Sequence, residues 1–224
     1  MKKVYLGLAI AGLLAGCAAP SDNAKTEMAA PVANEASMVV AAGTGDNLVA
    51  DPHIVEFRAN SGKSDVWKKH ADKNNGLGDV GSSKVSAFED EGSVRIRFIS
   101  ASDDFSAMPG LSQQVNGLAP NTDYVLSLYV EDKKGGASPT SVVVGATDAA
   151  GQELAEQEFH VASMNNAPYA DRKSFRQVAV EFNSGGNTSA TIFAKLKVDD
   201  ASAMTGDIGK ASEIRVDAFS LAKK

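Results

Sequence analysis

Apolar and polar residues alternate along short segments of this chain from about residue 47 to the C-terminus. In residues 93–99, for example, Val94, Ile96 and Phe98 alternate with two arginines. Further segments show the same alternation or a run of β-branched residues: 124–130, 141–145, 153–161, 175–182, 190–198 and 213–221. A period of two, bounded by Gly, Asn, Asp and Pro, is typical of antiparallel β-strands.

These segments predict an all-β fold, because helix signals are almost absent from this part of the chain. About eight to ten short strands are typical of a two-sheet antiparallel β-sandwich or jelly roll. The alternation also predicts which side chains point inward. We expect Tyr124 and Leu126 to face the core, and Ser127 and Tyr129 to face outward.

The N-terminal part has a different pattern. Two lysines precede a short apolar stretch, 4–14, which is shorter than the roughly 20 residues of a membrane-spanning helix and predicts a secretory signal. The run Leu14-Ala15-Gly16-Cys17 resembles the lipobox of bacterial lipoproteins. This resemblance implies a signal peptide at 1–16, removal of that peptide, and acylation of Cys17 with palmitate among its lipids. The two alanines that follow imply sorting to the outer membrane, on its periplasmic or its cell-surface face.

Residues 17–46 are rich in Ala and also contain Pro, Ser, Asn, Glu and Gly, with no sustained apolar period. Such a segment buries too little apolar surface to offset its ordering entropy. The sequence therefore predicts a disordered N-terminal tether from the lipidated cysteine to a domain at 47–224. The tether would keep that domain close to the membrane.

The composition excludes some classes of function and of site. The formal net charge is −6, which argues against a general nucleic-acid binder, because such a protein needs surplus positive charge for the phosphates. A single cysteine excludes an intrachain disulfide and any Cys-rich metal site.

Three stretches of the domain together resemble the jelly-roll carbohydrate-binding modules: 47–57 with its Asn-Leu-Val start, 114–130 with Gly-Leu-Ala-Pro-Asn-Thr-Asp-Tyr, and the closing 216–221. The resemblance implies a sandwich fold and a polysaccharide partner. It also implies a structural Ca²⁺ between the first and last strands, with Glu56 and Asp217 as the matching ligands. Ala218 departs from the family, which often has a second Asp there.

In those modules one outward, concave sheet face holds the glycan. Sugars are bound by aromatic platforms and by planar hydrogen-bonding groups, and Arg can bind a carboxylate through paired hydrogen bonds. By the alternation, we expect four outward side chains on that sheet: Arg97, Tyr129, Phe193 and Lys195. Their basic members favour an acidic glycan such as alginate.

Three further ligand-binding residues are expected in loops at the rim: Trp67, Tyr169 and Arg172. Trp67 is the only large apolar residue of 61–81, a polar and Lys-rich segment in which 66–73 could form a short helix or a loop. Each candidate has a structural alternative. Trp67 could cover an edge of the core, Tyr169 could pack its loop, and the arginines could simply line a solvated strand face.

Signs of catalysis are weak. The histidines, His53, His70 and His160, lack metal-binding spacing, and there is no Gly-x-Ser-x-Gly motif. The strand motifs of jelly-roll alginate lyases are also missing. The sequence therefore predicts a non-catalytic, membrane-anchored polysaccharide-binding lipoprotein. The alternatives are an envelope lipoprotein that binds a protein partner or has a structural role and, less favoured, a polysaccharide lyase.

Overall fold

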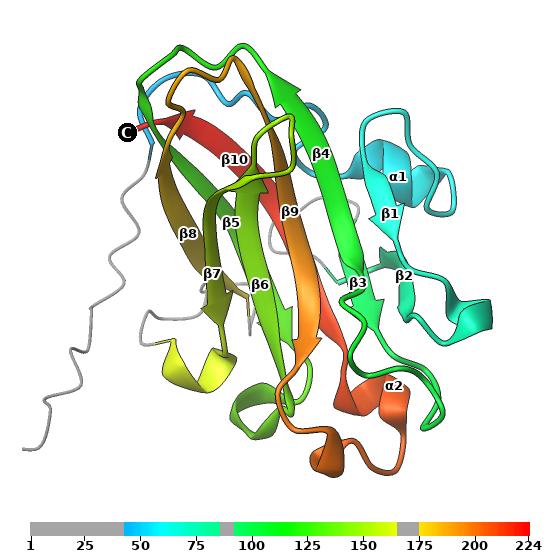
Figure 1. The fold of residues 1–224 in the computed structure, drawn as a ribbon. Coiled ribbons are helices and arrows are strands. Elements are labelled where there is room, and N and C mark those ends of the chain that lie inside the picture. Colours follow the sequence, from blue (N-terminus) through cyan, green and yellow to red (C-terminus); the bar gives the residue numbers. More distant parts are fainter. Residues whose placement is uncertain (1–42, 86–91, 165–174) are drawn as a thin grey trace, which may run out of the picture. The chain divides into compact units, whose positions relative to one another are not determined.

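The computed structural model describes residues 43–85, 92–164 and 175–224, and within them two antiparallel five-stranded sheets pack face to face (Figure 1). The predicted signal peptide, Cys17 and nearly all of the predicted tether lie outside the described residues, as do Tyr169 and Arg172. The predicted all-β sandwich is confirmed.

Sheet A has the strand order β2-β3-β10-β5-β8: β2 (Asp79–Ser83), β3 (Ser93–Arg97), β10 (Ile214–Lys223), β5 (Asp123–Asp132) and β8 (Arg176–Asn183). Sheet B has the order β1-β4-β9-β6-β7: β1 (Lys68–His70), β4 (Gly110–Asn116), β9 (Ser189–Val198), β6 (Thr140–Thr147) and β7 (Glu153–Phe159). In Figure 1 sheet B lies in front of sheet A. Each outer face is therefore formed by a different set of strands.

Helices are short in the described residues: α1 (Val55–Ala59), α2 (Ile208–Ala211), and the 3-10 turns η1 (Lys73–Asn75), η2 (Gly135–Ala137), η3 (Val161–Ser163) and η5 (Ala201–Ala203). Asp51 holds the start of α1, because its carboxylate accepts the backbone N–H groups of Val55 and Glu56 at 2.8 and 3.0 Å. In the part of the chain that the structure describes, no helix is long and apolar enough to span a membrane.

The core lies between the sheets and follows the predicted alternation. Tyr124 and Leu126 are fully buried, and Tyr129 faces outward with partial exposure, as expected. On β9, Ile192 and Ala194 are also fully buried. Burying these side chains removes apolar surface from water and is the main force that holds the two sheets together.

Seven of the strands agree with the predicted segments, and three were missed. The missed strands are β1, β2 and β4. Strand β1 and the beginning of β2 lie in 61–81, and 66–73 contains β1 in place of the expected short helix or loop. Strand β1 contains only three residues, Lys68, Lys69 and His70, all exposed, so no apolar alternation could mark it. It is held as an edge strand by its pairing with β4.

Candidate ligand-binding faces

The four side chains expected on one sheet are divided between two. Arg97 on β3 and Tyr129 on β5 belong to sheet A, whereas Phe193 and Lys195 on β9 belong to sheet B. All four point away from the core, so the two pairs lie on opposite outer faces of the sandwich. The expectation of a single site formed by these four residues is wrong. Local alternation tells which side of a strand is buried, but not which sheet the strand joins.

On sheet A the basic side chains are engaged by neighbouring acids. Arg97 Nε lies 3.4 Å and Arg95 Nη2 lies 3.3 Å from the same Asp79 carboxylate oxygen. Arg97 Nη1 also lies 3.8 Å from Glu213, and both arginines are only about a quarter exposed, at 26% and 27%. The guanidinium of Arg97 is therefore part of an internal ion-pair network.

The same network continues across the sheet. Arg215 forms ion pairs with Glu131 and Glu213, and its side chain is only 10% exposed. Lys133 Nζ lies 3.7 Å from Glu213, a nearly buried carboxylate. The arginines at the centre of sheet A are thus paired with acids of the same sheet or with Glu213, the residue before β10.

Tyr129 lines a hollow of about 440 Å³ on this face, and Asn47, His53, Ser127 and Gln177 line it too. The hollow lies where β10 is irregular, since the register with β5 shifts between Asp217 and Ser220. It offers a ring and several hydrogen-bonding groups, without a Lys or Arg among its lining residues. The role of Tyr129 in ligand binding stays a prediction.

The outer face of sheet B carries a group of basic side chains in register. Lys68 pairs with Ser112, which pairs with Phe193; His70 pairs with Gly110, which pairs with Lys195. Directly paired residues of antiparallel strands lie on the same face. We call Lys68, His70, Ser112, Phe193 and Lys195 the basic strip. From strand spacing and residue rise, it extends roughly 10 Å across the strands and about 7 Å along them.

The electrostatics of His70 show how close these groups are. Partial burial lowers the pKa of His70, and the positive charges of Lys68 and Lys195 lower it further. The His70 Nε2 atom lies 2.7 Å from the Ser112 hydroxyl oxygen. Within the described residues, neither Lys68 nor Lys195 forms an ion pair with an acidic side chain. Two ammonium groups thus remain available, with a neutral imidazole between them.

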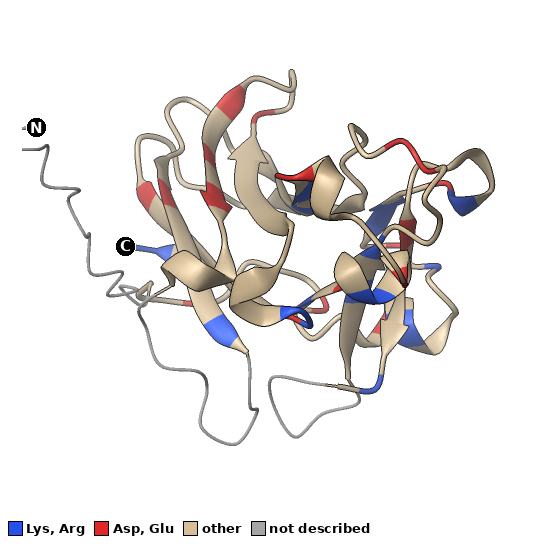
Figure 2. Cartoon of the chain, turned by 90° about the horizontal axis from the view of Figure 1, so that it is seen from below, with Lys and Arg blue, Asp and Glu red and all other residues tan. Residues whose placement is uncertain are grey.

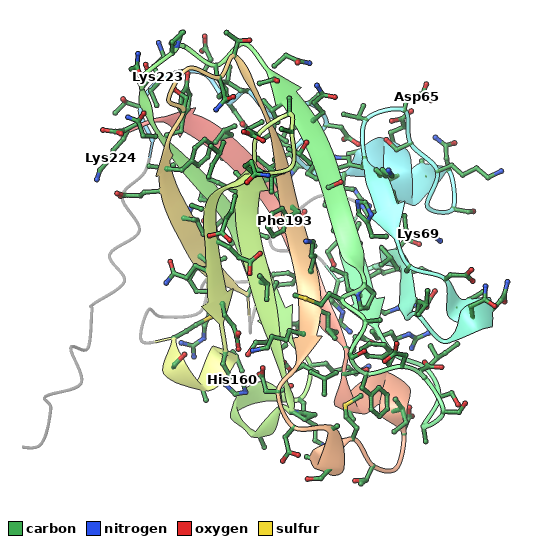
Figure 3. All side chains as sticks on the ribbon, in the orientation of Figure 1. Asp65, Lys69, His160, Phe193, Lys223 and Lys224 are labelled. Carbon is green, nitrogen blue, oxygen red and sulfur yellow. The ribbon has the colours of Figure 1, made fainter. Side chains whose placement is uncertain are left out.

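Phe193 is the floor of the strip and is only 3% exposed. The ammonium of Lys195 lies 4.0 Å above its ring centroid, which is cation–π geometry. Its other neighbour is Gly145 on β6, where a Cβ atom would lie 2.7 Å from the ring. Figure 3 shows Phe193 on β9, in the sheet that faces the viewer. Phe193 is therefore no open stacking platform; it supports Lys195, and a sugar could reach it only if Lys195 moved.

Acidic residues line the opposite edge of sheet B. Glu156 and Glu158 on β7 lie in the same two rows as the strip, beyond Gly145 and Val143 of β6. Figure 2 shows acidic residues on the strands of that end and many of the Lys and Arg residues at the other. Negative side chains thus lie at the β7 edge of this face, although Lys197 of β9 forms an ion pair with Glu158.

Trp67 is not a rim residue. It is 2% exposed, its indole N–H donates to the Asp51 carbonyl at 3.0 Å, and its ring centroid lies 4.7 Å from that of Phe219. The expectation of a sugar platform is wrong, and the alternative that Trp67 covers an edge of the core is right. An aromatic side chain with one polar atom can be buried when that atom finds a partner.

The two expected calcium ligands both have partners in the chain. The Glu56 carboxylate accepts hydrogen bonds from the Ser64 hydroxyl and the Asp65 backbone N–H, and the fully buried Asp217 accepts the N–H of Ala218. Ca²⁺ takes about six to eight oxygen ligands. Among the described residues, no group of three or more His, Cys, Asp or Glu could hold a metal. Backbone carbonyls would have to supply most ligands, and calcium stays a prediction.

Two members of the strip, Lys68 and His70, were missed in the sequence because β1 is too short to show a pattern. Ser112 lies on β4, which was also not recognised as a strand. The Lys-rich character of 61–81 was the available signal. It pointed to basic groups but not to the sheet that they join.

No family model matches the chain, and no curated protein matches it. Solved structures do resemble it, and they include carbohydrate-binding modules. TmCBM61 in complex with beta-1,4-galactotriose is 16% identical, with a TM-score of 0.48, over 80% of this chain and all of that one. The CBM22-1 xylan-binding domain of Xyn10C from Paenibacillus barcinonensis is 16% identical, with a TM-score of 0.45, over 82% and 97%.

The enzymatically active domain of tailspike protein 4 from bacteriophage CBA120 is 12% identical, with a TM-score of 0.49. The match covers 80% of this chain but only 21% of that one, so this chain spans about a fifth of its length. Likenesses this distant carry no argument about function. The class of the fold follows from the strand order and register above: an antiparallel two-sheet β-sandwich.

Proposed function

We propose that this protein is a non-catalytic polysaccharide-binding protein that holds an acidic glycan on the outer face of sheet B. The observation that carries the proposal is the basic strip, in which Lys68 and Lys195 flank His70 and have no acidic partner among the described residues. The resemblance of three sequence stretches to carbohydrate-binding modules supports the ligand class.

The chemistry of the strip suits a polymer with a carboxylate on each ring, such as alginate. Each Lys ammonium has three N–H donors that are not held in one plane, so it can donate hydrogen bonds to carboxylates in several orientations. The exposed side-chain amide of Gln114, the next outward position of β4, would offer hydrogen bonds to sugar hydroxyls. Because Phe193 holds the Lys195 ammonium over its ring, that charge loses little side-chain freedom when a ligand binds.

The proposal also places the protein at a membrane. A lipid anchor at Cys17 would tether the domain to the bacterial outer membrane and keep bound polymer at the cell surface or in the periplasm. Several acyl chains give stable anchoring, whereas one chain gives only marginal binding. Labelling of cells with a palmitate analogue tests this: we expect label in the native chain and none in Cys17→Ser.

Affinity gel electrophoresis in alginate tests the binding proposal. We expect retardation of the purified chain and at least a tenfold weaker interaction for the double variant Lys68→Ala and Lys195→Ala, with an unchanged melting temperature. The matched control is Lys223→Ala, which removes an exposed positive charge on sheet A. Equal retardation of the double variant and the native chain would overturn the site, and no retardation by alginate would overturn the acidic-glycan proposal.

A further inference from the structure

A hollow of about 360 Å³ lies directly beside the basic strip. Seven residues line it: His70, Ala71, Asp72, Leu77, Ala107, Met108 and Pro109. They come from the end of β1, from the segment that follows it, and from the segment that leads into β4. His70 belongs to both the strip and the hollow. A substituent of a sugar ring bound on the strip would therefore lie close to the hollow.

The lining is apolar and open to solvent. Leu77 and Met108 are 41% and 37% exposed, and they are two of the five exposed large hydrophobic side chains in the described residues. Ala107 and Pro109 add further apolar surface. Large apolar side chains that gather at one exposed hollow commonly mark a binding site.

The charge of Asp72 at the rim disfavours an anionic group. Asp72 lines the hollow, and its carboxylate accepts the Asn75 side-chain amide at 2.6 Å and the Asn74 backbone N–H at 3.1 Å. These hydrogen bonds, that of Asn75 first, lower the pKa of Asp72, so the group stays ionised. The negative charge of Asp72 disfavours a second carboxylate beside it, so an uncharged group suits the hollow better.

The hollow is already formed in the free protein. The two segments that line it are joined by a backbone hydrogen bond from Asp104 to Gly76 at 2.9 Å. Gly78 has a positive φ of 82°, and a Cβ atom there would lie 2.5 Å from the Pro109 ring. This close approach fixes the walls, so a ligand need not order them on binding.

From these observations we infer that the hollow takes a small, uncharged apolar substituent of the acidic glycan, namely an O-acetyl ester. The strip would bind the sugar carboxylates while the ester methyl group lies against Leu77 and Met108. The protein would therefore prefer an acetylated acidic polysaccharide over the same polymer without esters. This inference rests on the proposed function of the strip.

The test uses one acetylated alginate and the same polymer after mild alkaline de-esterification, in affinity gels with the purified chain. We expect about fourfold tighter binding to the acetylated form, the size expected for one buried methyl group. The double variant Leu77→Ala and Met108→Ala should bind both forms alike while it keeps the native affinity for the de-esterified polymer. The matched control Ile99→Ala, at an exposed apolar residue that does not line the hollow, should keep the preference.

The outcomes separate the two proposals. If the native chain binds both polymers equally, the acetyl site is overturned and the proposed function stands. A preference that survives in the Leu77 and Met108 double variant overturns the hollow as its cause. If neither polymer retards the native chain, the proposed function fails, and the inference fails with it.

Discussion

The two outer faces of the sandwich use positive charge in different ways. On sheet A, Arg97 and Arg215 are partly or largely buried and lie against Asp79, Glu131 and Glu213. On sheet B, Lys68 and Lys195 stand beside a neutral histidine and an aromatic ring. The comparison teaches that the availability of a cation, rather than its presence on an outward face, decides whether it can bind a ligand.

The difference follows from the acids on neighbouring strands. In sheet A, Asp79 on β2 and Glu131 on β5 lie beside the arginines of β3 and β10. In sheet B the neighbours of Lys195 are Gly110 and Val143, which supply no side-chain charge. The Glu158 carboxylate on β7 reaches across to β9, but there it forms an ion pair with Lys197 and not with Lys195.

The largest expected effect comes from breaking the sheet A network. Arg215→Ala leaves the nearly buried Glu131 and Glu213 without their main partner, which we expect to cost about 3 kcal/mol of unfolding free energy. Urea unfolding measures this, while retardation in alginate should stay unchanged. Lys195→Ala is the control: we expect its unfolding free energy to stay unchanged and its retardation in alginate to decrease. A loss below about 1 kcal/mol for Arg215→Ala would mean that this face is not held by its ion pairs.

The predicted calcium site joins sheet A to α1, because Asp217 lies on β10 and Glu56 on α1. If Glu56 and Asp217 hold a structural Ca²⁺, a chelator should lower the stability by about 2.7 kcal/mol at a hundredfold excess of the ion over its dissociation constant. Calorimetry with and without chelator measures the shift. Asp217→Asn should remove most of the response, and an unchanged melting temperature of the native chain would contradict the calcium prediction.

Releasing the arginines should make sheet A resemble sheet B. Asp79→Asn removes the carboxylate that Arg95 and Arg97 share, so both guanidinium groups become more available to an anion. We expect a loss of about 1 kcal/mol in stability, because these pairs are partly exposed. We also expect slightly stronger retardation in alginate. Ser82→Asn, at an exposed β2 position, is the control; weaker retardation of Asp79→Asn would contradict the comparison.

The smallest effect concerns pH. Burial and the charges of Lys68 and Lys195 lower the pKa of His70 below 6.5, and a bound carboxylate would raise it again. Binding should therefore take up protons, and the affinity for alginate should increase modestly as the pH falls from 7 to about 5. Gel retardation over this range measures the effect, and His70→Gln should flatten it.

The linked effect on stability has the opposite sign. The lowered pKa means that folded His70 binds a proton less readily than unfolded His70. The stability that neutral His70 contributes is therefore fully present above the unfolded pKa of about 6.5, and it is lost as the pH falls through the lower, folded pKa. For the binding prediction, the contradicting outcome is an affinity of the native chain for alginate that decreases as the pH is lowered from 7 to about 5.

The sequence was a good guide wherever burial alone decides the structure. Tyr124 and Leu126 were expected in the core and lie there, because an apolar side chain on a half-buried strand has only one favourable side. The division of Arg97 and Lys195 between two sheets could not be predicted, since it depends on pairing with strands far away in the chain. Trp67 was misjudged because its polar surroundings in sequence hide a buried position opposite Phe219.

The acidic edge of sheet B has a consequence for how a bound chain would run. Glu156 would repel a polyanion that crossed all five strands, whereas the basic side chains of β1 and β9 would attract one that ran parallel to them. A polymer would then pass along one side of the domain, with both of its ends free. Several copies of this protein could therefore bind one after another along a single long polysaccharide.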